Sequence, residues 1–172
     1  PTIDSMFKQL FYWDTYFINV GLLLDGYSSQ ALNNIKDIAY YINKKGYMPN
    51  AHNMDLRSQP PFFSKMIVDY YNFSKDKNFI KEFLPTLLKE YDFWMNERVG
   101  EFGLNVYKGY EMSDYELHGY YKYTGPRAGV YTGEDNKNQK QIAKNLIAIL
   151  ESGLDFNMRF KTDESRIDIH KF

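Results

Sequence analysis

The chain of 172 residues contains no cysteine, which excludes disulfide bonds and thiolate chemistry. This absence is compatible with cytoplasmic, periplasmic and secreted proteins alike. Its three histidines, His52, His118 and His170, lie too far apart in the sequence to match the spacing of metal ligands. The sequence therefore predicts neither a metal site nor a disulfide scaffold.

The chain also lacks a charge excess and long apolar runs. Its formal net charge is -1, with acidic and basic residues mixed and no basic run, so nothing indicates a nucleic-acid partner. No apolar run approaches the roughly 20 residues that a membrane-spanning helix needs, and no membrane partner is predicted. Hydrophobic residues make up 44% of the chain, which is enough for a packed core, and the length suggests one domain.

Aromatic residues are abundant, at 18% of the chain, with 16 Tyr and 13 Phe. They fit a large aromatic core. They equally fit a sugar-binding cleft, because Tyr and Trp rings stack on the apolar faces of pyranose rings. Composition leaves both interpretations open.

Apolar residues recur at helical spacing over most of the chain and predict an all-α protein built from α/α helical hairpins. The predicted helices are 11–24, 28 or 29 to 45, 58–73, 76–97 and 135–152. We expect Pro60 and Pro61 in the first turn of the third helix and an interruption of the fourth near Pro85. The apolar residues expected to keep the period of the fourth helix are Leu84, Leu87, Leu88, Tyr91, Trp94 and Met95.

Residues 99–134 break this pattern. Glycines punctuate a Tyr-rich stretch without helical period, which predicts a long irregular insertion, with short strands as an alternative. Its aromatic content argues against disorder and favours a functional loop.

Three groups of residues suggest chemistry, each with a plainer alternative. Asp155 follows a predicted helix end at Gly153, so it is either a candidate general acid or an ordinary Asp that bonds to local N–H groups. Arg57 and Gln59, beside Ser58, offer donors to sugar hydroxyls or to a carboxylate, or are surface residues at a helix start.

Trp13 and Asp14 are similarly ambiguous. The ring of Trp13 suits stacking on a sugar and the carboxylate of Asp14 suits hydroxyl groups. The alternative is a core Trp followed by a solvated Asp.

Several segments carry more information as an ordered set. They are Phe11–Phe17 followed by Gly21-Leu22-Leu23, Gly46–Asn50, Arg57–Pro61, Glu90–Met95, Gly125-Pro126-Arg127 and Glu151–Phe156. In this order they resemble the signature blocks of the trehalase family, inverting glycosidases that hydrolyse α,α-trehalose. The Arg-Ser-Gln-Pro-Pro block is unchanged at Arg57–Pro61.

The resemblance implies an (α/α)6 toroid that binds a disaccharide and requires no metal and no organic cofactor. It implies that Asp155 is the general acid. The residues that it implies as sugar contacts are Trp13, Asp14, Asn50, Arg57, Ser58, Gln59, Arg127 and Gly153. Met6, Gly129 and Leu154 differ from the family pattern at sugar-binding positions, which keeps open a related α-glycosidase of other specificity.

The family's general base has no counterpart in this sequence. Twelve helices with their loops need on the order of 300 residues, so 172 residues cannot close a toroid. We expect residues 1–172 to be the N-terminal portion of one (α/α)6 glycosidase-like domain, with the base on the remainder of the same polypeptide, and to be inactive alone. A truncated relative and a non-catalytic sugar-binding or structural protein are the alternatives.

Overall fold

The computed structural model describes residues 8–128 and 136–155. The helices are α1 (Tyr12–Leu24), α2 (Ser28–Lys45), α3 (Phe63–Ser74), α4 (Lys77–Asn96), α5 (Asp114–Thr124), a 3-10 helix (Pro126–Ala128) and α6 (Asn136–Glu151). Within these residues the only β-type pairings are isolated bridges, so the predicted all-α class is confirmed. The chain divides into two compact units, Pro1–Val106 (unit 1) and Tyr107–Phe172 (unit 2).

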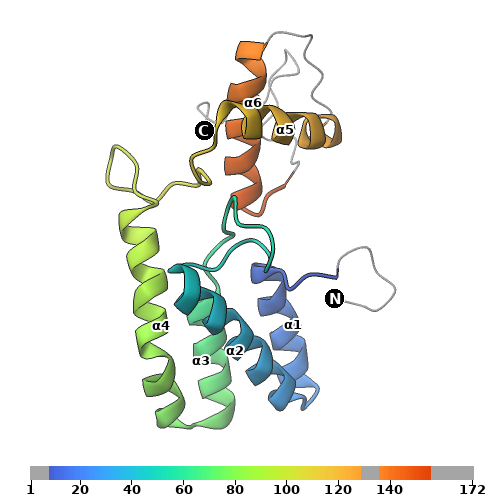
Figure 1. The fold of residues 1–172 in the computed structure, drawn as a ribbon. Coiled ribbons are helices and arrows are strands. Elements are labelled where there is room, and N and C mark those ends of the chain that lie inside the picture. The colour runs from blue at the N-terminus through green and yellow to red at the C-terminus, as the bar shows by residue number, and fades with distance from the viewer. Residues whose placement is uncertain (1–7, 129–135, 156–172) are drawn as a thin grey trace. The chain divides into compact units, whose positions relative to one another are not determined.

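Unit 1 consists of helices α1 to α4 (Figure 1). Helices α2 and α3 each pack against all three of the other helices, which places the core between them. The fully or nearly buried core residues are Tyr12, Ile35, Ile38, Ala39, Ile42, Met48, Phe63, Met66, Ile67, Phe79 and Phe83. Burial of this apolar surface stabilises the unit because each such side chain contributes about 1.5–3 kcal/mol when removed from water.

The first two helices match their predicted bounds closely. Ile35, Ile38 and Ile42 are buried at the helical spacing that predicted α2. Gly46 ends this helix in the left-handed region, with φ +84°, where a side chain is disfavoured. The chain then enters the extended segment that leads to Asn50.

The predicted start of the third helix at Ser58 is wrong, because α3 begins at Phe63. Gln59 and Pro60 each precede a proline, and a residue in that position is pushed out of the helical region. Residues 58–62 are therefore non-helical, and Ser58 makes its hydrogen bond elsewhere.

Helix α4 differs from its prediction in two ways. It continues through Pro85. Proline has no N–H group to bond to the main-chain carbonyl oxygen of Lys81, four residues earlier, but both residues are exposed, so water can bond to that oxygen. The apolar face of α4 was also predicted only in part, because Trp94 is buried and Leu87 partly buried, but the other four of the six apolar residues expected to keep the period are exposed. The buried residues are Phe79, Phe83, Thr86, Glu90, Phe93 and Trp94, whereas Leu84, Leu88, Tyr91 and Met95 are exposed.

Two polar residues explain that face. The Thr86 hydroxyl accepts a hydrogen bond from the Asn43 side chain of α2, 2.9 Å away, and Glu90 accepts one from Tyr12 of α1. Buried polar groups require such partners. Both partners come from other helices, so the spacing of apolar residues along α4 could not reveal them.

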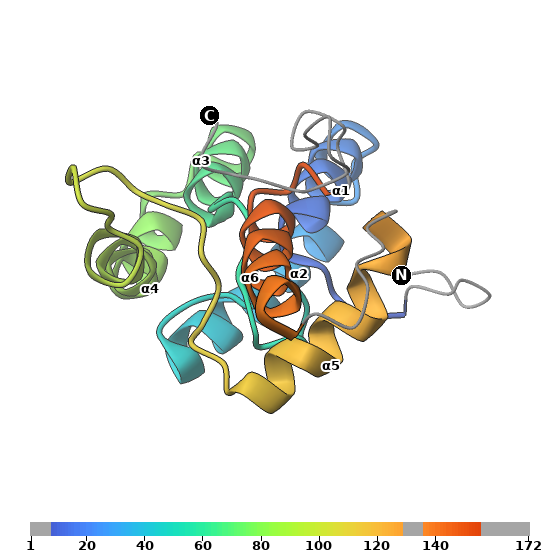
Figure 2. The same ribbon diagram turned by 90° about the horizontal axis from the view of Figure 1, so that it is seen from above.

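Unit 2 contains α5 and α6, and α5 packs across α6 (Figures 1 and 2). Helix α5 corrects the prediction that 99–134 is irregular throughout, although residues 129–134 lie outside the described part. The helix begins with a capping box, in which Ser113 and Glu116 exchange side-chain to backbone hydrogen bonds. The Ser113 hydroxyl also donates to the Glu116 carboxylate at 2.7 Å, and this bond, followed by the one from the Ser113 N–H, holds the pKa of Glu116 below its usual value. The core of unit 2 comprises Leu117, Tyr121, Ala128, Ile142, Ala143, Leu146, Ile147 and Ile149.

None of the helices in the described parts of the chain combines the length and apolar character that crossing a membrane requires.

Candidate functional site

The segment 50–59 is attached along the start of α1 by main-chain hydrogen bonds. The Tyr12 N–H donates to the carbonyl oxygen of Asn50 at 2.9 Å and joins the segment to α1. Within the segment, the Asn50 N–H donates to the carbonyl oxygen of Arg57 at 2.9 Å. An isolated bridge between Phe11 and Ala51 adds to this attachment. Residues separated by some forty positions in sequence therefore meet at one end of α1.

Side chains complete this meeting point. The Arg57 Nη1 donates to the Asn50 Oδ1 at 3.0 Å, and the Trp13 main-chain N–H donates to the Gln59 Oε1 at 3.2 Å. We call Trp13, Asn50, Arg57 and Gln59 the α1 cluster. It unites four of the residues that the sequence predicted as sugar contacts.

The members of the α1 cluster differ in accessibility. Asn50 and Gln59 are buried, whereas Trp13 and Arg57 are half-buried. The Trp13 ring lies beside those of Phe17 and Phe62, with centroid distances of 6.0 and 6.3 Å. Trp13 is thus partly a packing residue and partly accessible, which combines the two alternatives drawn from its sequence.

The two other predicted contacts of unit 1 flank the cluster. Asp14 is exposed on α1, next to Trp13. Ser58 is fully buried, and its hydroxyl donates to the carbonyl oxygen of Met48 at 2.6 Å. This bond gives Ser58 a structural role in the loop, which the sequence prediction missed.

In unit 2, Gly153 and Asp155 form the turn that follows α6. Gly153 is buried with φ +75°, and Asp155 is exposed with φ +49°. A non-glycine residue in the left-handed region is uncommon, and Asp and Asn are the residues that tolerate it best. Ser152 supports the turn, because its hydroxyl donates to the Ile149 carbonyl oxygen at 2.6 Å and accepts from the Leu154 N–H at 3.3 Å.

Arg127 lies on the 3-10 helix of unit 2 and is exposed. Its guanidinium group stacks over the Tyr123 ring, 5.6 Å from the centroid, and its Nη1 lies 3.5 Å from the Tyr123 hydroxyl. Met6 and Gly129, at which the sequence departs from the family pattern, lie outside the described residues. Among the residues that are described, no group of three or more His, Asp or Glu side chains could hold a metal ion.

The family model of trehalases matches residues 5–168, almost the whole chain. The chain belongs to the trehalase family. A trehalase of Bombyx mori is 32% identical over 170 residues, covering 92% of this chain and 28% of that protein. A trehalase of Arabidopsis thaliana is 28% identical over 170 residues, with 92% and 26% covered. A periplasmic trehalase of Shigella flexneri serotype 5b is 29% identical over 177 residues, with 94% and 31% covered.

This trehalase-family chain therefore spans less than a third of the length of these relatives. The match runs through both units, since residues 5–168 include the α1 cluster and the turn at Asp155.

Sequence reasoning about this trehalase-family chain missed a buried pair beneath the α1 cluster. The Tyr12 hydroxyl donates to the Glu90 Oε1, and both residues are buried. Burial raises the pKa of Glu90 from 4.5 to about 7, against the lowering effect of the Tyr12 hydrogen bond. Burial, with the nearby Glu90 carboxylate, also raises the pKa of Tyr12. The sequence did contain a signal for this pair. Glu90 stands at helical spacing from Phe83, Thr86 and Phe93, so it falls on the buried face of α4.

A second missed residue is Glu151, the last residue of α6. Its carboxylate is fully buried and accepts hydrogen bonds from two successive main-chain N–H groups, Lys108 at 2.8 Å and Gly109 at 3.0 Å. A negative charge at a helix C-terminus is unfavourable to the helix dipole, so these two donors compensate it. The Glu151 carboxylate thereby ties the segment before α5 to the end of α6.

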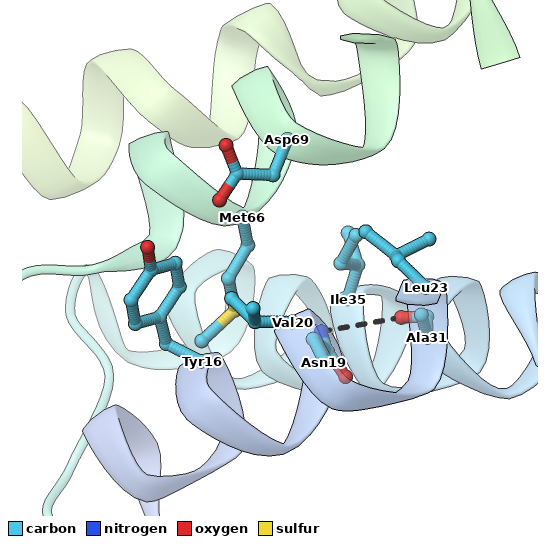
Figure 3. A pocket seen from close by; sticks show the side chains of 8 residues that line it. All are labelled: Tyr16, Asn19, Val20, Leu23, Ala31, Ile35, Met66 and Asp69. Carbon is cyan, nitrogen blue, oxygen red and sulfur yellow. Dashed lines mark hydrogen bonds between the residues drawn. The ribbon is translucent and has the colours of Figure 1, made fainter. Parts of the chain in front are cut away.

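The hollow in unit 1 that Figure 3 shows lies apart from the α1 cluster. It lies between α1, α2 and α3 and contains none of the predicted site residues. Its one buried polar side chain, Asn19, is already bonded to Ala31 and Asn34. The lining residues are Tyr16, Asn19, Val20, Leu23, Ala31, Ile35, Met66 and Asp69.

Proposed function

We propose that the polypeptide to which this chain belongs is a glycoside hydrolase that cleaves an α-linked glucoside, such as α,α-trehalose, with inversion. The observation that carries the proposal is the α1 cluster, in which distant segments present an indole ring, a guanidinium group and two amides together. Membership of the trehalase family supports it. We further infer that residues 1–172 are part of one (α/α)6 domain, since the relatives are more than three times as long as the matched segment.

In this proposal Asp155 donates a proton to the leaving glycosidic oxygen while a water attacks the anomeric carbon from the opposite face. The general base that activates the water lies on the remainder of the polypeptide. Because Asp155 is exposed, the burial that keeps a general acid protonated comes from that remainder and from the bound sugar. Residues 1–172 alone are therefore inactive.

We infer a role in sugar binding for the predicted contacts of each unit. Trp13 offers the accessible part of its ring for stacking, and Asp14 offers an exposed carboxylate to hydroxyl groups. Arg57 presents a charged donor, and its contact with Asn50 keeps it in place. Asn50, Ser58 and Gln59 are the other contacts proposed in unit 1, and they are buried parts of the loop that carries Arg57. Arg127 and Gly153 are the contacts proposed in unit 2.

The test uses the full-length protein with α,α-trehalose and early proton NMR of the products. Inversion converts the attacked residue to β-glucose, while the leaving residue remains α-glucose, so equal amounts of both anomers are expected initially. The Asp155→Asn variant should lose at least about a thousandfold in kcat with an unchanged circular dichroism spectrum, because the proton donor is absent. Asp37→Asn, at an exposed position on α2, is the matched control and should remain fully active. Near-normal turnover by Asp155→Asn would refute the assignment.

A different α-glycoside is the second candidate. Leu154 stands where the family pattern has an aromatic residue, and its side chain is 41% exposed beside Asp155, so a stacking face is missing there. A panel of α-linked disaccharides separates the substrates. Retained sugar binding by calorimetry without hydrolysis of any member would instead indicate a non-catalytic sugar-binding relative.

A further inference from the structure

The Tyr12 hydroxyl connects three helices of unit 1 at one point. It belongs to α1, donates its hydrogen to the Glu90 Oε1 of α4, and accepts the N–H of Phe63, the first residue of α3, at 2.9 Å. Tyr12 is 0% exposed and Glu90 4%. The Tyr12 hydroxyl donates its single hydrogen to Glu90. Its oxygen lone pairs remain available as acceptors, and one of them accepts the hydrogen bond from the Phe63 N–H.

The bond to Phe63 replaces a missing helix cap. The first N–H groups of a helix have no partner within the helix, and the residue before α3 supplies no side-chain cap. The adjoining Pro60 and Pro61 have no N–H groups to offer as anchors. The Phe63 N–H is therefore the point at which the end of the segment 50–63 is attached to the core.

Tyr12 holds this segment at both ends. Its main-chain N–H binds the Asn50 carbonyl oxygen, and its hydroxyl binds the Phe63 N–H. Arg57 and Gln59 lie between these two points, and Gln59 contacts the residue next to Tyr12. Movement of the segment at either end would displace the side chains of the α1 cluster.

We propose that Tyr12 and Glu90 are positioning residues for sugar binding, in which the Glu90 carboxyl group orients the Tyr12 hydroxyl and the hydroxyl fixes the segment 50–63 that carries Arg57 and Gln59. This inference rests on the proposed function for its kinetic test. A role limited to stability would leave KM unchanged in the folded fraction of a variant. A positioning role raises KM, because the ordering of the segment must then accompany binding.

The decisive variant is Tyr12→Phe, which keeps the buried ring and removes only the hydroxyl. Leaving the buried Phe63 N–H unpaired should raise KM about five- to thirty-fold, with kcat changed by less than about threefold. The Glu90→Gln variant retains an acceptor for the Tyr12 hydroxyl and should stay within about threefold of the wild-type KM. The matched controls are Tyr70→Phe, whose hydroxyl makes no hydrogen bond to a described residue, and Glu82→Gln, exposed on α4.

Hydrogen exchange in the same full-length proteins provides a readout that does not require hydrolysis. In Tyr12→Phe the amides of the peptide covering 57–63 should exchange at least about tenfold faster, while Tyr70→Phe matches the wild type. Unchanged exchange there, or a fall in kcat at constant KM, overturns the positioning role. If the wild-type protein hydrolyses no α-linked glucoside, the proposed function fails. The exchange experiment then still tests whether Tyr12 fixes the segment 50–63: faster exchange in Tyr12→Phe supports this role, and unchanged exchange overturns it.

Discussion

Glu90 should make the stability of unit 1 depend on pH in a way that one substitution removes. The carboxyl group is buried, and among the described residues the Tyr12 hydroxyl is its hydrogen-bond partner. Burial disfavours the ionised form and raises the pKa of Glu90 from 4.5 to about 7. In the Glu90→Gln variant the position is neutral at every pH while the side chain keeps its shape.

The direction of the effect follows from proton binding. Between the two pKa values the folded protein holds a proton on Glu90 that the unfolded chain has released, so the free energy of unfolding falls as pH rises. The stabilisation is complete below the unfolded pKa of 4.5 and is lost as pH rises through the folded pKa of about 7. This pKa difference corresponds to about 3 kcal/mol at its full extent, a large share of the roughly 5–15 kcal/mol that stabilises a typical domain.

Urea unfolding of the wild type and of Glu90→Gln, at pH values from 5 to 8, measures this difference. Residues 1–172 contain two tryptophans, Trp13 and Trp94, and both belong to unit 1, so the tryptophan fluorescence of this chain follows that unit. We expect the wild type to lose about 2–3 kcal/mol relative to the variant across this range. Taking the difference between the proteins cancels the titration of the groups that they share.

Parallel stability curves for the two proteins would refute the reasoning, because they would show that burial does not disfavour the Glu90 charge. Glu82→Gln provides the control, since Glu82 is exposed on the same helix. Its curve should run parallel to that of the wild type.

Two further substitutions test local structure. Gly46→Ala should cost about 1–2 kcal/mol in urea unfolding, because φ is +84° and no atom lies within 4 Å of the added methyl group, so backbone strain acts alone; a cost below about 0.3 kcal/mol would contradict this. Glu151→Ala should speed hydrogen exchange at Lys108 and Gly109, since both N–H groups lose their acceptor. Unchanged exchange at both amides would show that this carboxylate does not hold them.

Local signals predicted the helices whose ends and faces are set by their own residues. Helix α2 combines a clear apolar period with Gly46 at its end, and both features were readable. Helix α5 was also within reach, because Ser113 and Glu116 have capping-box spacing. The glycines and tyrosines around them obscured that signal.

Non-local contacts account for the errors. The buried face of α4 depends on a hydrogen bond between residues 78 positions apart, and no window of sequence contains both partners. The two prolines keep residues 59 and 60 out of the helix by a local rule, and the Tyr12 hydroxyl, which receives the Phe63 N–H from 51 positions away, helps to fix the start of α3 at Phe63. Propensity and apolar spacing describe neighbours along the chain, so they cannot place such a contact.

The candidate site shows the same division within a single block. Arg57, Ser58 and Gln59 were predicted together as sugar contacts, but the Ser58 hydroxyl donates to Met48 and the Gln59 side chain accepts from Trp13. Because these two side chains are buried and bonded within unit 1, their replacement would act on a ligand mainly through the loop that they hold. Asp14, exposed beside Trp13, has no such structural bond among the described residues. Loss of its carboxylate should therefore weaken sugar binding without loosening the loop, which distinguishes a contact from a support within one recognition surface.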